Sequence, residues 1–351
     1  MVLNSWINRW MIVFVSAAIC IGCVDSSGEE GYPDELDGTV DALASDSTID
    51  PFDGGGDMLP QPGPEWTRVE SGTAENLRAV ACRSGGIWAV GDNGTILHSS
   101  GGQSFVAQES SEKPDFSSVA FINSLEGVVV GGARILETTD GGETWDPSWF
   151  CAVIAMSVYH KVIMVEQGVG YAIGQSNLDE GTYKYRIPQG WNCFASRKWP
   201  GDTLYTGAYT GPDSGFMTGD TGGDVFKTTD ASTWETVSTG FSNVFHDMIF
   251  ETSLTGWIVG EDGIVLRTDD EGESWRSLSA ATDATLLSIA YKEGGIVVAV
   301  GDEGTVIEST DGGESFTAAA SGVENSLNGV CFSDDRAVIV GDDGLILQKG
   351  F

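Results

Sequence analysis

A glycine-centred phrase recurs seven times along the chain, and this recurrence restricts the fold more than any other feature. Each copy joins an apolar run to a polar turn, as in WAVGDNG (88–94) and WIVGEDG (257–263). The steps between the shared glycines are 40, 43, 45, 41, 41 and 40 residues, the glycines being Gly91, Gly131, Gly174, Gly219, Gly260, Gly301 and Gly341. A period of about 40–45 residues is typical of β-propeller blades. The spacing therefore predicts an all-β fold, a seven-bladed β-propeller.

Each copy is predicted to form four strands. In the sixth copy the first three strands are LLSIAY (286–291), GIVVAVG (295–301) and TVIEST (305–310). The turn GDEG joins the second strand to the third, because Gly and Asp tolerate the positive φ angles of a tight hairpin. The fourth strand follows the phrase STDGGESF (309–316).

The seventh copy ends after its third strand, at LILQKGF. Residues 64–77 resemble the segment that follows the third strand in other copies, with Trp66 in the place of Phe316. We therefore predict that the N-terminal strand completes the last blade of a propeller spanning residues 65–351. Closure of the ring removes sheet edges that would otherwise invite aggregation.

The phrase STDGGESF recurs as TTDGGETW (138–145) and TDDEGESW (268–275), with a shortened copy TTDASTW (228–234). It resembles the Asp-box, in which a carboxylate accepts backbone N–H bonds, glycines take positive φ, and a final aromatic side chain is buried. These residues are predicted to be structural: Asp140, Trp145, Asp230, Trp234, Asp270, Trp275, Asp311 and Phe316.

The chain is strongly acidic, with 17 Lys and Arg against 52 Asp and Glu and a net charge of −35. This balance excludes nucleic-acid binding, which needs a basic surface, and disfavours anionic membrane surfaces. It favours a basic protein partner, cations or plain solubility.

The turns between second and third strands should all emerge on one face of the propeller. They carry eight acidic residues that we expect to surround the channel mouth as an acidic binding face: Asp92, Asp220, Glu261, Asp262, Asp302, Glu303, Asp342 and Asp343. The alternative interpretation is that Asp-Gly is simply favourable turn chemistry.

The N-terminus is predicted to be a targeting segment. Residues 1–22 combine Arg9 with a short apolar run, which is typical of a signal peptide. The ending CIGC resembles a lipobox, with Cys23 as the lipidated residue and Cys20 in place of the usual leucine. The acidic, Gly/Pro/Ser-rich stretch up to residue 64 is predicted to be a disordered tether. We therefore expect an exported protein, lipid-anchored to a bacterial outer membrane or cell surface, with no other membrane contact.

Four cysteines lie in the predicted propeller. In an exported protein disulfide pairing is the default. We expect Cys82 with Cys331, on first strands of adjacent blades, and Cys151 with Cys193, which bracket the irregular third copy. The alternative is buried free thiols.

No catalytic residue, metal ligand or cofactor is predicted. His98, His160 and His246 lack metal-ligand spacing. The YRIP segment (185–188) resembles an arginine-bearing sialidase motif, but it lies in the third copy and not in the first blade. His246 and Asp247 begin a first strand, where propellers line their channel, and either contact a ligand or pair with each other.

Taken together, the repeats resemble the photosystem II assembly and stability factor family over residues 66–351. The resemblance implies a seven-bladed propeller with Asp-boxes that acts as a non-catalytic chaperone for a reaction-centre subunit. Photosynthetic members are reported to use an arginine-rich patch, whereas the arginines here are scattered: Arg78, Arg83, Arg134, Arg186, Arg197, Arg267, Arg276 and Arg336.

We therefore expect a monomeric, non-catalytic, envelope-anchored scaffold that binds a protein partner outside photosynthesis. The first alternative is a sialidase-like propeller that binds or hydrolyses glycans, for which two positioned carboxylates would be needed. A calcium-stabilised module is the second alternative.

Overall fold

The computed structural model describes residues 65–148, 157–165, 169–176, 181–187, 190–199 and 203–351. Their secondary structure consists of β-strands joined by turns and short 3-10 segments. No helix among these residues has the length and apolar character needed to cross a bilayer. The signal segment, Cys23, the tether and Cys151 lie outside the described residues.

The strands are short, as expected for propeller blades. The strands of the first half are β1 (Thr67–Val69), β2 (Leu77–Arg83), β3 (Gly86–Gly91), β4 (Ile96–Ser99), β5 (Val106–Ala107), β6 (Ser118–Phe121), β7 (Gly127–Gly131), β8 (Arg134–Thr138), β9 (Asp146–Pro147), β10 (Ser157–Met164), β11 (Gly170–Ser176), β12 (Gly181–Ile187), β13 (Gly190–Trp199) and β14 (Leu204–Tyr209). Those of the second half are β15 (Gly215–Gly219), β16 (Asp224–Thr228), β17 (Glu235–Ser238), β18 (Phe245–Phe250), β19 (Gly256–Gly260), β20 (Val265–Thr268), β21 (Arg276–Leu278), β22 (Leu286–Lys292), β23 (Ile296–Gly301), β24 (Val306–Ser309), β25 (Thr317–Ala319), β26 (Leu327–Ser333), β27 (Arg336–Gly341) and β28 (Ile346–Gly350).

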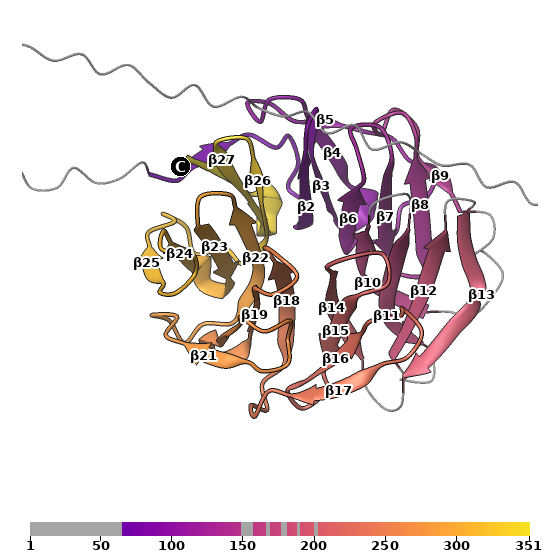
Figure 1. Cartoon of the computed structure of the whole chain (residues 1–351). Helices are drawn as coiled ribbons and strands as arrows, with labels where there is room; N and C mark the ends of the chain where they lie inside the picture. Colours follow the sequence, from indigo (N-terminus) through magenta and orange to yellow (C-terminus); the bar gives the residue numbers. More distant parts are fainter. Residues whose placement is uncertain (1–64, 149–156, 166–168, 177–180, 188–189, 200–202) are drawn as a thin grey trace, which may run out of the picture. The chain divides into compact units, whose positions relative to one another are not determined.

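These strands form seven four-stranded antiparallel sheets (Figure 1). Six sheets contain four consecutive strands, and the remaining sheet has the order β1-β28-β27-β26. The first strand of each sheet contacts the first strand of the next, in the order β2, β6, β10, β14, β18, β22, β26 and back to β2. The fold is therefore an all-β propeller with four-stranded blades.

The N-terminal strand joins the last sheet, as predicted. Strand β1 pairs with β28 in a register that sets Thr67 opposite Gln348 and Val69 opposite Ile346. Trp66 is 8% exposed, and its indole N–H donates to the Glu308 carboxylate at 3.1 Å. The first and last segments of the domain are thus held in one sheet.

Buried second strands make up most of the core between the sheets. Every residue of β3, β7, β15 and β19 is buried, because both faces of these strands pack against neighbouring sheets. Contacts between adjacent sheets are polar as well as apolar. Trp88 and Trp257 donate indole N–H bonds, each at 3.0 Å, to the carbonyls of Gly141 and Gly313 in the Asp-box hairpin of the following sheet.

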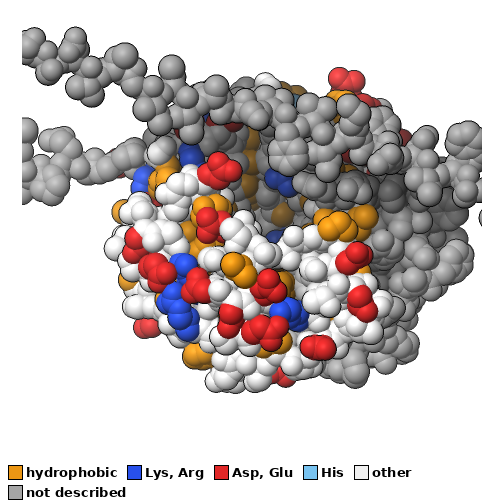
Figure 2. Space-filling view, viewed as in Figure 1, with side chains coloured by type: hydrophobic (Ala, Val, Ile, Leu, Met, Phe, Trp, Pro, Cys, Tyr) orange, Lys and Arg blue, Asp and Glu red, His pale blue; other side chains and the backbone are white. Residues whose placement is uncertain are grey.

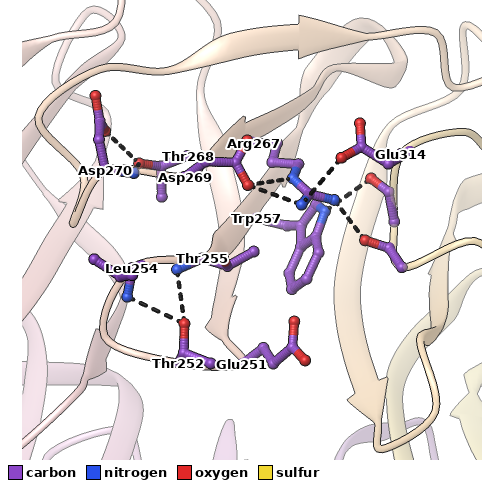
Figure 3. A network of polar contacts seen from close by, with 12 residues as sticks. Glu251, Thr252, Leu254, Thr255, Trp257, Arg267, Thr268, Asp269, Asp270 and Glu314 are labelled. Atoms are coloured by element: carbon purple, nitrogen blue, oxygen red, sulfur yellow. Dashed lines mark hydrogen bonds and ion pairs between the residues drawn. The ribbon is translucent and has the colours of Figure 1, made fainter.

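Arg267 adds an ionic contact to one of these inter-sheet junctions (Figure 3). Its guanidinium lies over Trp257, 5.2 Å from the ring centroid. It also pairs with Asp269 at 2.8 Å and with Glu314 of the next sheet at 3.1 Å. Because Arg267 is only 9% exposed, its charge is held between two carboxylates and an aromatic face.

The Asp-box hairpins have the hydrogen bonds that the motif predicts. The Asp311 carboxylate accepts bonds from the Ser315 N–H at 3.1 Å and hydroxyl at 2.6 Å. The equivalent carboxylates Asp140, Asp230 and Asp270 accept the same kinds of bond. The final aromatics Trp145, Trp275 and Phe316 are buried, whereas Trp234 of the shortened copy is half-buried.

Acid should weaken these hairpins. Bonds from the Thr144 hydroxyl and N–H lower the pKa of Asp140 to about 2. Its stabilising contribution is therefore present above the ordinary Asp pKa and is lost as pH falls toward 2. We expect the difference in urea midpoint between the wild type and Asp140→Asn to shrink between about pH 5 and pH 2. The control Glu109→Gln, at an exposed position, should show no such trend, and a pH-independent difference for Asp140→Asn would contradict the prediction.

One turn is strained. In four aligned copies the residue five positions before the first strand of the sheet has a positive φ. Three of these residues are glycines, Gly72 (φ 79°), Gly240 (81°) and Gly322 (78°), and the fourth is Ala281 (φ 56°). A left-handed conformation costs a residue with a Cβ about 1–2 kcal/mol.

Ala281→Gly relieves this strain, but Gly also raises the conformational entropy of the unfolded chain, which offsets part of the gain. We therefore expect a net rise of roughly 0.5–1 kcal/mol in the free energy of unfolding. Gly322→Ala is the matched control, because no heavy atom lies within 4 Å of the added Cβ and only backbone strain changes. It should lower stability by a similar amount. Urea denaturation measures both variants, and a loss of stability in Ala281→Gly would refute the argument.

Candidate functional site

A repeated β-bulge aims side chains at the centre of the propeller. In β2, β14, β18, β22 and β26 the pairing with the following strand slips at the second residue, and in β10 it slips at the fourth. Bulges re-aim side chains and are common beside functional sites. The residues at the slip are Arg78, His160, Tyr205, His246, Leu287 and Asn328.

All six bulge residues line a central cavity of about 390 Å³. Its lining comes from the first strands of all seven sheets, with Ser117 preceding β6. Figure 2 shows one face of the molecule, hollowed near its centre, with Lys and Arg side chains visible in the hollow and Asp and Glu side chains on the surface around it. A cavity of this size with convergent polar groups is the default candidate for a binding site.

At the equivalent position of three first strands, a polar side chain bonds to the backbone of the neighbouring first strand. The Ser118 hydroxyl accepts the Val162 N–H at 3.1 Å, and the Ser288 hydroxyl accepts the Val330 N–H at 3.3 Å. Asp247 occupies the same position in β18 and accepts the Ile289 N–H at 3.2 Å. These side chains therefore tie several neighbouring strands of the channel wall together.

Asp247 is the charged centre of this wall and is 5% exposed. Its carboxylate pairs with the Lys161 ammonium at 2.8 Å. It also accepts hydroxyl bonds from Thr206 and Ser288, each at 3.1 Å, and its own strand supplies the Met248 N–H at 3.0 Å. The carboxylate is satisfied by four strands and not by His246, so the predicted local pair is absent.

The bulge residues of three neighbouring strands form a row of rings. His160 meets Tyr205 edge to face, with centroids 5.4 Å apart, and Tyr205 lies 6.0 Å from His246. Burial lowers the pKa of His160. Burial also lowers the pKa of His246, against the opposing effects of Glu261, Asp302 and Asp247. Both imidazoles are therefore neutral at pH 7.

Five of the eight predicted acidic residues lie close enough to this cavity to act on its lining, whereas Asp262 lines a separate pocket with Asn243 and Ser277. The turns of four copies begin as 3-10 segments, η1 (Asp92–Gly94), η3 (Glu261–Gly263), η4 (Asp302–Gly304) and η5 (Asp342–Gly344). Asp92 and Asp342 act electrostatically on Arg78, Asp220 and Glu261 on Tyr205, and Glu261 and Asp302 on His246. We call the eight predicted residues the acidic rim.

Three residues of the acidic rim are partly neutralised or tied down. Asp92 forms a salt bridge with Arg78. Asp342 accepts a bond from Asn328 at 2.9 Å, and Asp302 accepts one from Ser326 at 2.7 Å. Two more, Asp262 and Asp343, accept bonds from Asn243 at 3.2 Å and from Asn325 at 2.9 Å. These two are exposed, as are Asp220, Glu261 and Glu303.

Turn chemistry accounts for part of this pattern. Asp262, Glu303 and Asp343 have φ near 56°, a conformation in which Asp and Asn are enriched. Asn93 has the same conformation and carries no charge. Because a neutral residue serves the turn equally well, the backbone alone does not require the acidic side chains.

Cys82 and Cys331 are joined by a disulfide, with Cα atoms 5.7 Å apart. The bond links β2 to β26, the first strands of adjacent sheets, which is one of the two pairings expected. The pairing of Cys151 with Cys193 stays a prediction, since it rests on side chains beyond those described. The same holds for Arg186 of the YRIP segment.

Sequence reasoning missed the cavity lining. Lys161, Thr206 and Tyr205 were not singled out. An alignment of the seven copies on the buried residue that precedes each bulge would have put them at or next to the cavity-lining position. Asp115 was also missed, and its carboxylate accepts the Asn93 N–H at 2.9 Å beside the acidic rim.

The cavity does not resemble a glycosidase site. Among its described lining residues Arg78 is the only arginine, and it is already paired with Asp92. The only lining carboxylate is Asp247, which is held by Lys161. No group of three or more His, Cys, Asp or Glu in the described part of the chain is arranged to hold a metal ion.

Comparison with solved structures places the fold among β-propellers. YCF48 bound to a D1 peptide superposes with a TM-score of 0.66 at 20% identity, covering 84% of this chain and 96% of the other. YCF48 from Cyanidioschyzon merolae gives 0.65 at 18% identity, covering 82% and 98%. A virginiamycin B lyase from Staphylococcus aureus gives 0.68 at 10% identity, covering 82% and 99%. At such low identities the likeness shows the fold alone.

The sequence comparison is more selective. No curated protein matches the chain. Residues 226–286 match the family model described as photosynthesis system II assembly factor YCF48. Over this segment, and in the repeats that run from 66 to 351, the chain is similar to the photosystem II assembly factor-like β-propellers.

Proposed function

We propose that this protein is a non-catalytic, seven-bladed scaffold that binds a basic segment of a protein partner at its acidic rim. The single observation that supports the proposal is that five acidic residues, Asp92, Asp220, Glu261, Asp302 and Asp342, act electrostatically on side chains that line a polar cavity. A related propeller, YCF48, has been solved with a bound peptide. The high net negative charge would attract a basic segment and speed its association.

The scattered arginines favour a partner other than an acidic one. Arg78 is paired with Asp92, Arg134 with Glu112, and Arg267 with Asp269 and Glu314. Paired cations offer little attraction to an acidic ligand, so we infer a role outside photosynthesis. The analogy with YCF48 that we propose therefore concerns peptide binding in general and not the particular peptide that YCF48 binds.

Neutralising the acidic rim tests the proposal. The four-site variant carries Glu261→Gln, Asp262→Asn, Asp302→Asn and Glu303→Gln. The matched control removes the same number of exposed charges from hairpins at the opposite ends of the strands, as Glu126→Gln, Glu143→Gln, Glu293→Gln and Asp335→Asn. The probe is a synthetic peptide of alternating Arg and Ser, whose affinity is measured by calorimetry at low and physiological salt.

We expect the rim variant to bind the peptide about tenfold more weakly than the wild type, with a shallower dependence on salt. The control variant should keep most of the wild-type affinity. Equal losses in the two variants would show that net charge alone attracts the peptide and would overturn the proposed site.

We further propose that the protein is exported and held at the bacterial envelope by a lipid on Cys23. Support comes from the apolar run before CIGC and the acidic stretch after it. Labelling with a radioactive fatty acid should mark the wild type and spare Cys23→Ser. Equal labelling of both proteins would exclude Cys23 as the anchor.

A further inference from the structure

The row of rings at the cavity mouth is chemically unusual because its polar groups lack partners. His160, Tyr205 and His246 come from β10, β14 and β18, and each is the bulge residue of its strand. Within the described residues no hydrogen bond joins their ring nitrogens or phenol to another group, and His160 Nε2 is buried without a partner. Three adjacent rings with unused polar atoms suit a ligand better than a packed wall.

The surroundings of these rings select the charge of that ligand. Asp220 and Glu261 act on Tyr205, and Glu261 and Asp302 act on His246. The two cations of the cavity are already paired, Lys161 with Asp247 at 2.8 Å and Arg78 with Asp92. The free charge beside the rings is therefore negative, and the ligand that fits is a cation.

The shape and hydration of the site select the kind of cation. A guanidinium is planar, stacks on aromatic faces and is less strongly hydrated than an ammonium. Its N–H donors match neutral imidazole nitrogens and carboxylates, which are the acceptors present here. An ammonium is a compact, strongly hydrated charge and would lose more hydration on entering the cavity.

We propose that His160, Tyr205 and His246, with Glu261 and Asp302 beside them, receive an arginine side chain that the partner inserts into the cavity. This inference rests on the proposed function, because it names the residue through which a basic segment engages the mouth. The cavity volume of about 390 Å³ accommodates one such side chain.

The chain offers a direct test because it has only three histidines. In the full chain with carbon-13-labelled histidine, each imidazole gives its own NMR signal. His98 serves as an internal reference, since it stacks on Trp88 away from the cavity, with centroids 4.9 Å apart. The probes are N-acetyl-arginine amide and N-acetyl-lysine amide, titrated separately.

We expect the arginine probe to shift the His160 and His246 signals saturably and to leave His98 unchanged. The lysine probe should bind more weakly. Tyr205→Ala should weaken arginine binding by about fivefold to thirtyfold, whereas Tyr205→Phe, which keeps the ring, should bind nearly as the wild type does. An unchanged His98 signal in Tyr205→Ala verifies that the variant is folded.

Equal shifts of all three histidines, or equal binding of the two probes, would overturn the proposal without any variant being needed. Wild-type affinity in Tyr205→Ala would do the same. If the rim variant loses peptide binding while Tyr205→Ala keeps it, the arginine site fails and the proposed function stands. If neither variant affects peptide binding, both fail.

Discussion

Removal of the disulfide by Cys82→Ala and Cys331→Ala should lower the free energy of unfolding by about 5 kcal/mol, the largest effect expected of any change described here. The two cysteines are 249 residues apart in sequence. A cross-link over so long a loop restricts the unfolded chain strongly, and the chain-entropy model scales this restriction with the logarithm of loop length. Urea denaturation under non-reducing conditions measures the loss.

The other cysteine pair supplies the matched control. If Cys151 and Cys193 are joined as predicted, Cys151→Ala with Cys193→Ala removes the same atoms across a shorter stretch of chain and should cost less. Reduction of the wild-type protein should reproduce the combined loss. A decrease below about 1 kcal/mol in the Cys82 and Cys331 variant would show that the pairing of β1 with β28 closes the ring without help from the disulfide.

Asp247→Ala should cost about 3 kcal/mol, because it breaks a buried ion pair and leaves several donors unsatisfied. The Lys161 ammonium, the Ile289 N–H and the Thr206 hydroxyl all lose their acceptor. The Lys161 side chain is 33% exposed, so water can solvate part of the freed charge. The expected loss of stability therefore lies at the lower end of the range for broken buried ion pairs.

A double-mutant cycle separates the ion pair from the other bonds. Lys161→Met combined with Asp247→Ala should cost less than the sum of the two single variants, since each single variant leaves a lone charge in the wall and the double variant leaves none. Strict additivity would mean that the pair contributes nothing. Thermal unfolding followed by circular dichroism gives the free energies, and binding of the arginine probe to Lys161→Met tests whether the cavity stays intact.

The repeat predicted the sheets because blade structure is local. The sixth copy shows this: LLSIAY (286–291) forms β22 and TVIEST (305–310) forms β24, with no end shifted by more than one residue. Closure by the N-terminal strand was also predictable, since Trp66 aligns with the aromatic that ends each Asp-box. Both inferences compare the chain with itself and need no knowledge of which sheets touch.

Contacts between sheets were beyond such reasoning. Lys161 and Asp247 are 86 residues apart, lie two sheets from each other, and have no common motif. The Trp257 bond to Gly313 likewise depends on how far one sheet is rotated against the next. The bulge that aims Tyr205 inward arises from a slip in strand pairing, which residue types do not record. The acidic turn residues could be picked out from the sequence, and the residues that line the cavity could not.

The pairing of β1 with β28 affects the order in which this protein can be completed. The strands meet across 281 residues. At a synthesis rate of about 5–20 residues per second, β1 leaves the ribosome roughly 15–55 s before its partner exists. An unpaired strand that waits so long is exposed to proteases and to other chains. The first segment of the domain to be made is therefore the last to reach its place.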